Sequence, residues 1–129
     1  RMKKLAPLRT EIMPSAGSAL AELAIIEKKL SDGANYAQFT EAFRDGISRV
    51  QTFLDLPQLK TLTETYKDDE FIELRKLIQS AADKVFECQA AWREKNNTGK
   101  NFDLQSWLGK IYGDLENGKA LFEKLKKSE

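Results

Sequence analysis

In the second half of the chain, apolar side chains recur at steps of three and four residues. Between residues 71 and 92 this stripe consists of Phe71, Leu74, Ile78, Ala81, Val85, Cys88 and Trp92. Between residues 104 and 125 it consists of Leu104, Leu108, Ile111, Leu115, Gly118, Phe122 and Leu125. Such spacing places side chains on one face of an α-helix, and no alternating strand pattern of useful length accompanies it. The pattern therefore predicts two long amphipathic helices.

The first half of the chain carries two less regular apolar stripes. They consist of Leu20, Leu23, Ile26 and Leu30, and of Tyr36, Phe39, Phe43, Ile47, Val50 and Leu54. Helical spacing also covers residues 2 to 13, before Pro14, and residues 59 to 66, after Pro57. A proline inside a helix removes a backbone donor and collides with the preceding turn. We therefore expect two further helices, kinked or interrupted at Pro14 and Pro57.

Glycine, asparagine and proline separate these segments, notably at residues 31–33 and 96–101. At about 1.5 Å per residue, four segments of roughly 26 to 32 residues would have matched lengths. Matched lengths with short connections favour an all-α fold, an antiparallel up-down-up-down four-helix bundle. The 129 residues would form a single domain, and because the chain begins with Arg1 we expect it to be a piece of a longer protein.

Polar residues at the expected helix ends support these boundaries. Asn35 with Gln38 resembles a capping box for the second helix. Carboxylates at residues 68–70 could cap the third helix, and Asn101 or Asp103 could cap the fourth. Lysines lie where the fourth helix should end, namely Lys124, Lys126 and Lys127.

Composition excludes several classes of function. The 21 basic and 20 acidic residues leave a net charge of +1, so we expect no nucleic-acid partner. The chain has no histidine and one cysteine, which removes most proton shuttling near neutral pH and every histidine-containing metal site. Phosphate-binding glycine loops are also missing from the sequence. We therefore expect a protein that is not an enzyme and that takes no cofactor and no metal.

Two features could still support a reaction or a metal site, namely the single cysteine and a run of acidic residues. Cys88 could be a nucleophile, but it lies on the apolar stripe without a histidine base, so a buried side chain is the better interpretation. The acids Asp68, Asp69, Glu70 and Glu73 could attract a divalent cation, but the calcium-loop pattern is absent and helix capping is the better interpretation. A single cysteine, apolar runs too short for a bilayer and no signal sequence together predict a cytoplasmic protein, with peripheral membrane association as an alternative.

Aromatic and basic residues gather around the turn between the third and fourth helices. The candidate ligand-binding or lipid-binding residues are Trp92, Arg93, Lys95, Lys100, Phe102, Trp107 and Lys110. Cations can pair with a phosphate while an aromatic ring rests at the lipid interface. The alternative is that both tryptophans close the end of the core and that the lysines are solvated.

Gly109 and Gly113 lie four residues apart inside the fourth helix, with Gly118 following. Each interior glycine costs roughly 1 kcal/mol relative to alanine, so either internal packing or a close-approaching partner should compensate. The sequence favours a non-enzymatic interaction module, an adaptor or scaffold within a larger intracellular protein, with another protein as its partner. The alternative is a membrane-targeting module that binds anionic lipid, with a phosphoinositide as one candidate.

Overall fold

The fold is all-helical over the part of the chain that is described. A computed structural model describes residues 2–128, with side chains from residue 5 onward, and no strand occurs in that range. Its elements are α1 (Met2–Ser31), α2 (Tyr36–Leu54), α3 (Pro57–Lys60), the π-helical turn η1 (Thr61–Thr65), α4 (Asp69–Thr98) and α5 (Leu104–Lys127).

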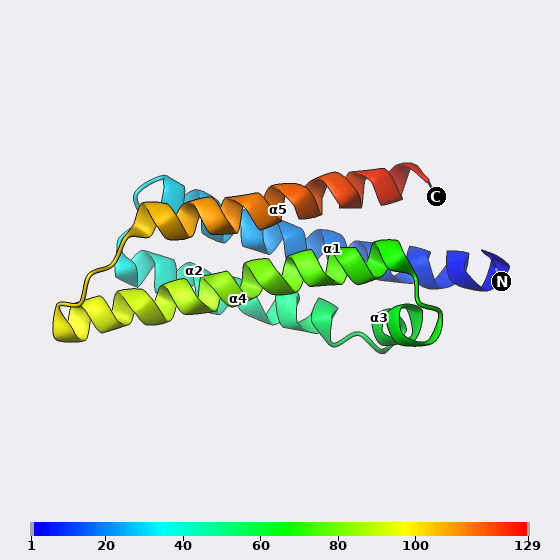
Figure 1. The fold of residues 1–129 in the computed structure, drawn as a ribbon, viewed down its shortest axis with the longest axis horizontal. Helices are drawn as coiled ribbons and strands as arrows, with labels where there is room; N and C mark the ends of the chain where they lie inside the picture. Colours follow the sequence, from blue (N-terminus) through cyan, green and yellow to red (C-terminus); the bar gives the residue numbers. More distant parts are fainter. Residues whose placement is uncertain (1, 129) are drawn as a thin grey trace.

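The long helices α1, α2, α4 and α5 lie side by side (Figure 1). Both ends of the chain lie at one end of the molecule, together with α3 (Figure 1). The α1–α2 and α4–α5 connections lie at the opposite end (Figure 1). Packing is most extensive between α1 and α2 and between α4 and α5, and it is less extensive between α1 and α5 and between α2 and α4.

The expected interruption at Pro14 is wrong, because α1 runs from Met2 to Ser31 with Pro7 and Pro14 inside it. Pro14 is exposed, so water can solvate the backbone carbonyl that has lost its donor. Its neighbours Ile12, Met13 and Ala16 are buried in the core. Burial of these side chains holds the helix together across the proline; a kink without a break stays a prediction.

The expected interruption at Pro57 is confirmed. α2 ends at Leu54, and Pro57 is the first residue of α3, where its missing N–H costs no helical hydrogen bond. The second predicted helix is therefore a 19-residue helix followed by the short α3–η1 segment, whereas α1 and α4 each have 30 residues.

The predicted helix ends are confirmed. Asn35 and Gln38 form a reciprocal capping box at the start of α2. The Asp68 carboxylate accepts from the backbone N–H of Phe71, and Asp103, rather than Asn101, accepts from that of Ser106. The lysines predicted for the end of α5 lie in its last turn.

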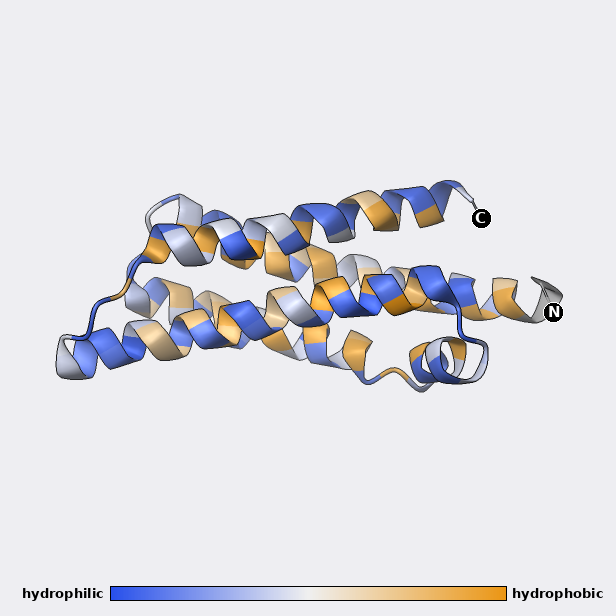
Figure 2. Ribbon diagram, in the orientation of Figure 1, coloured by the Kyte–Doolittle hydropathy of each residue, from blue (hydrophilic) through white to orange (hydrophobic). Residues whose placement is uncertain are grey.

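The predicted apolar stripes meet in one core. Apolar and polar residues share each long helix (Figure 2). The largest fully buried side chains come from α1, α2, α3, η1, α4 and α5, and they include Phe39, Phe53 and Phe71. Gly17 and Gly118 let α1 and α5 approach closely, since a Cβ at either would stand 3.0 Å from Phe122 or 3.1 Å from Leu20 respectively. In the described range, no helix is both long enough and apolar enough to cross a membrane.

Candidate functional site

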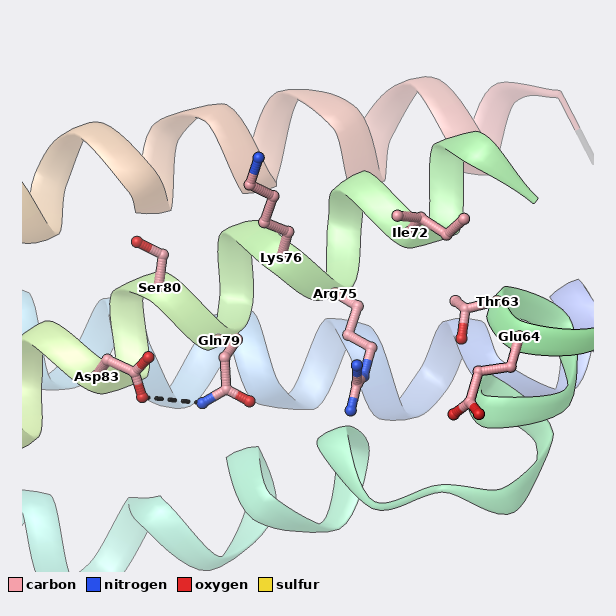
Figure 3. A pocket seen from close by; sticks show the side chains of 8 residues that line it. All are labelled: Thr63, Glu64, Ile72, Arg75, Lys76, Gln79, Ser80 and Asp83. Carbon is pink, nitrogen blue, oxygen red and sulfur yellow. Dashed lines mark hydrogen bonds between the residues drawn. The ribbon is translucent and has the colours of Figure 1, made fainter. Parts of the chain in front are cut away.

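An open hollow of about 530 Å³ lies over α4, next to η1 (Figure 3). It is lined by Thr63, Glu64, Ile72, Arg75, Lys76, Gln79, Ser80 and Asp83. None of these residues was singled out from the sequence as part of a binding site. We treat this hollow as the candidate functional site because it combines open volume with charged and apolar side chains.

The hollow is lined by residues of η1 and α4, the elements that follow the early end of α2 in the chain. Asp55 and Leu56 separate α2 from α3, so α2 stops before it can accompany α4 along its whole length. Leu59 and Leu62 are fully buried and anchor the α3–η1 segment to the core. The π-helical hydrogen bond from the Tyr66 N–H to the Thr61 carbonyl is 3.2 Å long. π-Helical turns are rare in proteins overall, but those that occur are often found at functional sites.

Three lining residues are held by hydrogen-bond partners in a neighbouring helix or within their own helical segment. The Ser80 hydroxyl donates to the Asp114 carboxylate over 2.6 Å, which ties α4 to α5. The Gln79 amide donates to Asp83 over 2.9 Å (Figure 3). Thr63 donates its hydroxyl proton to the carbonyl of Leu59. These bonds leave Thr63, Gln79 and Ser80 with fixed orientations around the hollow.

Three charged side chains of the hollow are not held in this way. Within residues 2–128, the side chains of Arg75, Lys76 and Glu64 make no hydrogen bond and no ion pair. Arg75 and Gln79 extend to the α2 side of α4, whereas Lys76 and Ser80 extend to the α5 side (Figure 3). A ligand in the hollow would therefore meet both signs of charge.

Exposed apolar side chains lie along the same helix. Ile72 lines the hollow and is 39% exposed. Phe86 is 41% exposed and lies 14 residues further along α4, with its ring edge-to-face on Phe43 at 4.8 Å. Large apolar side chains at an exposed position beside an open hollow are typical of contact surfaces. The sequence could have flagged Ile72 and Phe86 only as apolar residues outside the buried stripe.

The sole cysteine is not available for chemistry at neutral pH. Cys88 of α4 is fully buried in the core of the molecule. This confirms the burial predicted from its position on the apolar stripe. Burial raises the pKa of the Cys88 thiol to about 11. In the part of the chain that is described, no group of three or more acidic or cysteine side chains converges to hold a metal ion.

The acidic run at residues 68–70 is engaged in structure. Arg9 donates to both carboxylate oxygens of Asp68, over 2.8 and 2.9 Å, and also to Glu70 over 3.3 Å. Glu70 in turn pairs with Lys124 of α5. Asp68 is buried and caps α4, as the capping interpretation predicted. This network joins α1, α4 and α5.

Two of the three aromatic residues predicted at the α4–α5 turn, Trp92 and Phe102, are in ring contact. Trp92 stacks on Phe39 at 5.7 Å and on Phe102 at 5.2 Å, and Tyr36 meets it edge-on. Trp92, Phe102 and Trp107 are all partly buried against the core. The rings of Trp92 and Phe102 thus close this end of the molecule, and a lipid role for them stays a prediction.

The basic residues of the same predicted site lie at the surface. Arg93, Lys95, Lys100 and Lys110 are exposed. Among them, Lys110 lies over the Trp107 ring, with Nζ 4.8 Å from its centroid. The other three make no ion pair within residues 2–128. The structure thus shows one cation–π pair and three solvated cations.

The three glycines of α5 separate into two kinds. Gly118 is buried and packs against Leu20. Gly109 and Gly113 are exposed, and a Cβ at either would meet nothing within 4 Å. Internal packing therefore explains Gly118 and does not explain Gly109 or Gly113, for which a docking partner stays a prediction.

Comparisons of the chain with protein-family models, with curated proteins and with solved structures found no match.

Proposed function

We propose that the chain is a non-enzymatic protein-interaction module, an adaptor or scaffold domain of a larger intracellular protein, whose docking face is the hollow over α4. The carrying observation is that Arg75, Lys76 and Glu64 stand without partners around an open volume of about 530 Å³ that also exposes Ile72. Protein interfaces typically combine an apolar centre with charged groups that set orientation and partner choice.

The architecture supports a rigid scaffold. The fold fits an antiparallel up-down-up-down four-helix bundle, with α3–η1 inserted between its second and third helices. The ends shared by successive helices in Figure 1 support this topology. In such a bundle, the backbone groups of α4 bond within the helix, so its side chains form a fixed surface for a partner.

Chemical inertness of the site also supports a binding role. The side chains at the hollow are three hydrogen-bonded polar groups, charged groups and one isoleucine. Nucleophilic catalysis requires a nucleophile with a base held against it, and the hollow offers Ser80 bonded to a carboxylate that Lys84 also contacts. That carboxylate serves the α4–α5 contact, which favours binding over catalysis at this surface.

Site-specific photo-crosslinking in cells of the source organism tests the proposal. A benzophenone amino acid would replace Ile72 in the hollow, Tyr112 on the outer face of α5, or Glu41 on the exposed side of α2 as the matched control. We expect a protein adduct from position 72 and none from position 41. Adducts from position 112 alone would move the docking face to the glycine-bearing side of α5, and no protein adduct from 72 or 112 would contradict the proposal.

A second proposal, membrane targeting through anionic lipid, is supported by the exposed cations near Trp107. Lys110 and Trp107 form a cation–π pair on the first turns of α5, and Arg93, Lys95 and Lys100 are solvated nearby in sequence. Sedimentation with phosphoinositide vesicles should then be weakened by Lys100→Glu and by Trp107→Ala, with helical content unchanged. Equal sedimentation of the wild-type chain with neutral and anionic vesicles would reject it.

A further inference from the structure

We infer that the partner filling the hollow over α4 is an amphipathic helix of about three to four turns, carrying an acidic side chain for Arg75 and a basic one for Glu64. The inference rests on the proposed interaction function and names the class of partner. Three observations support it. They are the length of the row of side chains along α4, the use of the α4 backbone groups within the helix, and the unpaired charges of Arg75 and Glu64.

The length follows from the spacing along α4. Ile72, Arg75, Gln79, Asp83 and Phe86 follow one another at steps of three and four residues, so they share one side of the helix. Because a helix rises about 1.5 Å per residue, this row extends over roughly 21 Å. α2 is a 19-residue helix beside the 30-residue α4, and its pairing with α4 is the least extensive among the neighbouring long helices. A partner of three to four turns matches the row.

The backbone chemistry favours a helix as the occupant. An extended peptide needs backbone partners, as at the open edge of a sheet, and α4 uses its own backbone groups internally. A strand placed in the hollow would leave its own N–H and C=O groups unpaired. A helix satisfies these groups itself and presents only side chains, which can fit between the ridges of α4 and η1.

The charges specify the polar side of that helix. Arg75 and Glu64 have no ion partner in the described chain, and both would lose water when the hollow is covered. An uncompensated charge at an interface weakens binding strongly, so the partner must supply an acid near Arg75 and a base near Glu64. Apolar side chains on the same helix would contact Ile72 and Phe86, which are 39% and 41% exposed.

A display selection with reversed charges tests this assignment. A library of 14-residue peptides on a helix-forming alanine scaffold, with acidic, basic and apolar residues varied, would be selected against the wild-type chain. A second selection would use the double variant Arg75→Glu, Glu64→Arg. We expect the wild-type chain to enrich peptides with one order of acid and base and the double variant to enrich the opposite order. Binding of the wild-type peptides should fall at least tenfold with Arg75→Glu alone.

Matched controls separate the outcomes. Arg44→Glu changes the same charge on the exposed surface of α2 and should leave binding unchanged, and circular dichroism checks that every variant is folded. The inference is overturned if both selections enrich the same charge order, if proline-rich extended peptides bind the hollow better, or if a second copy of the chain occupies it in sedimentation. A protein adduct at position 72 together with any of these results would leave the interaction function standing and reject only the helical partner.

Discussion

At the scale of single residues, identical amino acids have different roles because their surroundings differ. Gly109, Gly113 and Gly118 all lie inside α5, and their sequence spacing gave no means of separating them. The packing of α1 against α5 makes Gly118 necessary and leaves the other two in open space. Glycine in a helix interior lowers stability unless a close approach requires it.

We expect Gly109→Ala and Gly113→Ala each to raise the free energy of unfolding by about 0.5 to 1 kcal/mol, because alanine loses less backbone entropy on folding. Gly118→Ala should instead lower it by about 1 kcal/mol, since the new Cβ would stand 3.1 Å from Leu20, which is itself 5% exposed. Urea unfolding of the three variants measures these values. Stabilisation by Gly118→Ala equal to that of the other two would contradict the packing described for α1 and α5.

The burial of Cys88 makes the free energy of unfolding depend on pH. Burial raises its pKa from 9.0 to about 11, so the folded state holds the thiol proton over a range where the unfolded chain releases it. The corresponding stability is fully present below pH 9 and is lost as the pH rises through 11. The wild-type chain should therefore lose roughly 2 to 3 kcal/mol more than Cys88→Ala between pH 8 and pH 11.5. Urea midpoints at both pH values test this, because tyrosine and lysine titrations are common to the two proteins.

At the scale of elements, helix ends follow from nearby residues and helix continuity does not. The capping groups Asn35, Asp68 and Asp103 act on N–H groups three residues away, so the local sequence predicts them correctly. Pro14 removes a backbone donor inside α1, and a local argument therefore predicts a kink or a break there. The burial of Ile12 and Ala16 against distant helices outweighs this effect, and no local pattern contains that information.

The start of α4 depends on one buried carboxylate. Asp68 caps the helix and accepts two of the three hydrogen bonds that the Arg9 side chain donates, and this contact is the main cause that raises the pKa of Arg9. Asp68→Ala should lower the free energy of unfolding by about 2 to 4 kcal/mol, because it removes the cap and leaves a partly buried guanidinium short of its partner. Asp69→Ala, one residue further and exposed, should cost about 0.5 kcal/mol or less in the same urea titration. Equal losses would show that the Arg9 contact contributes nothing.

At the scale of the whole molecule, the ring of Trp92 joins three segments at the end opposite the termini. Trp92 of α4 contacts Phe39 of α2 and Phe102 of the α4–α5 connection. The sequence predicted that aromatics gather at this turn, yet it left open whether they face lipid or the core. The core contact of Trp92 depends on the position of α2, which supplies Phe39 from more than 50 residues away in the chain, and a lipid role stays a prediction.

Truncating this ring should affect the whole fold. We expect Trp92→Ala to lower the free energy of unfolding by about 2 to 4 kcal/mol, because it opens a void between two stacked rings. Trp107→Ala should lower the free energy of unfolding by only about 1 kcal/mol. Trp107 is partly buried, and the contact that the structure shows on the face of its ring is the cation of Lys110. Thermal unfolding followed by near-ultraviolet circular dichroism compares the two. A Trp92→Ala protein as stable as Trp107→Ala would contradict the closing role of Trp92.

The sequence by itself determined the helices, most of their ends and the side of each that faces the core, because these depend on periodicity and on contacts within one turn. Only the tertiary structure decided that α1 continues through Pro14, that Gly109 and Gly113 face open space, and that η1 and α4 leave an open hollow beside Arg75. These outcomes depend on how far separate helices overlap in space. Overlap is set by packing between residues distant in the chain, so no spacing within a single segment encodes it.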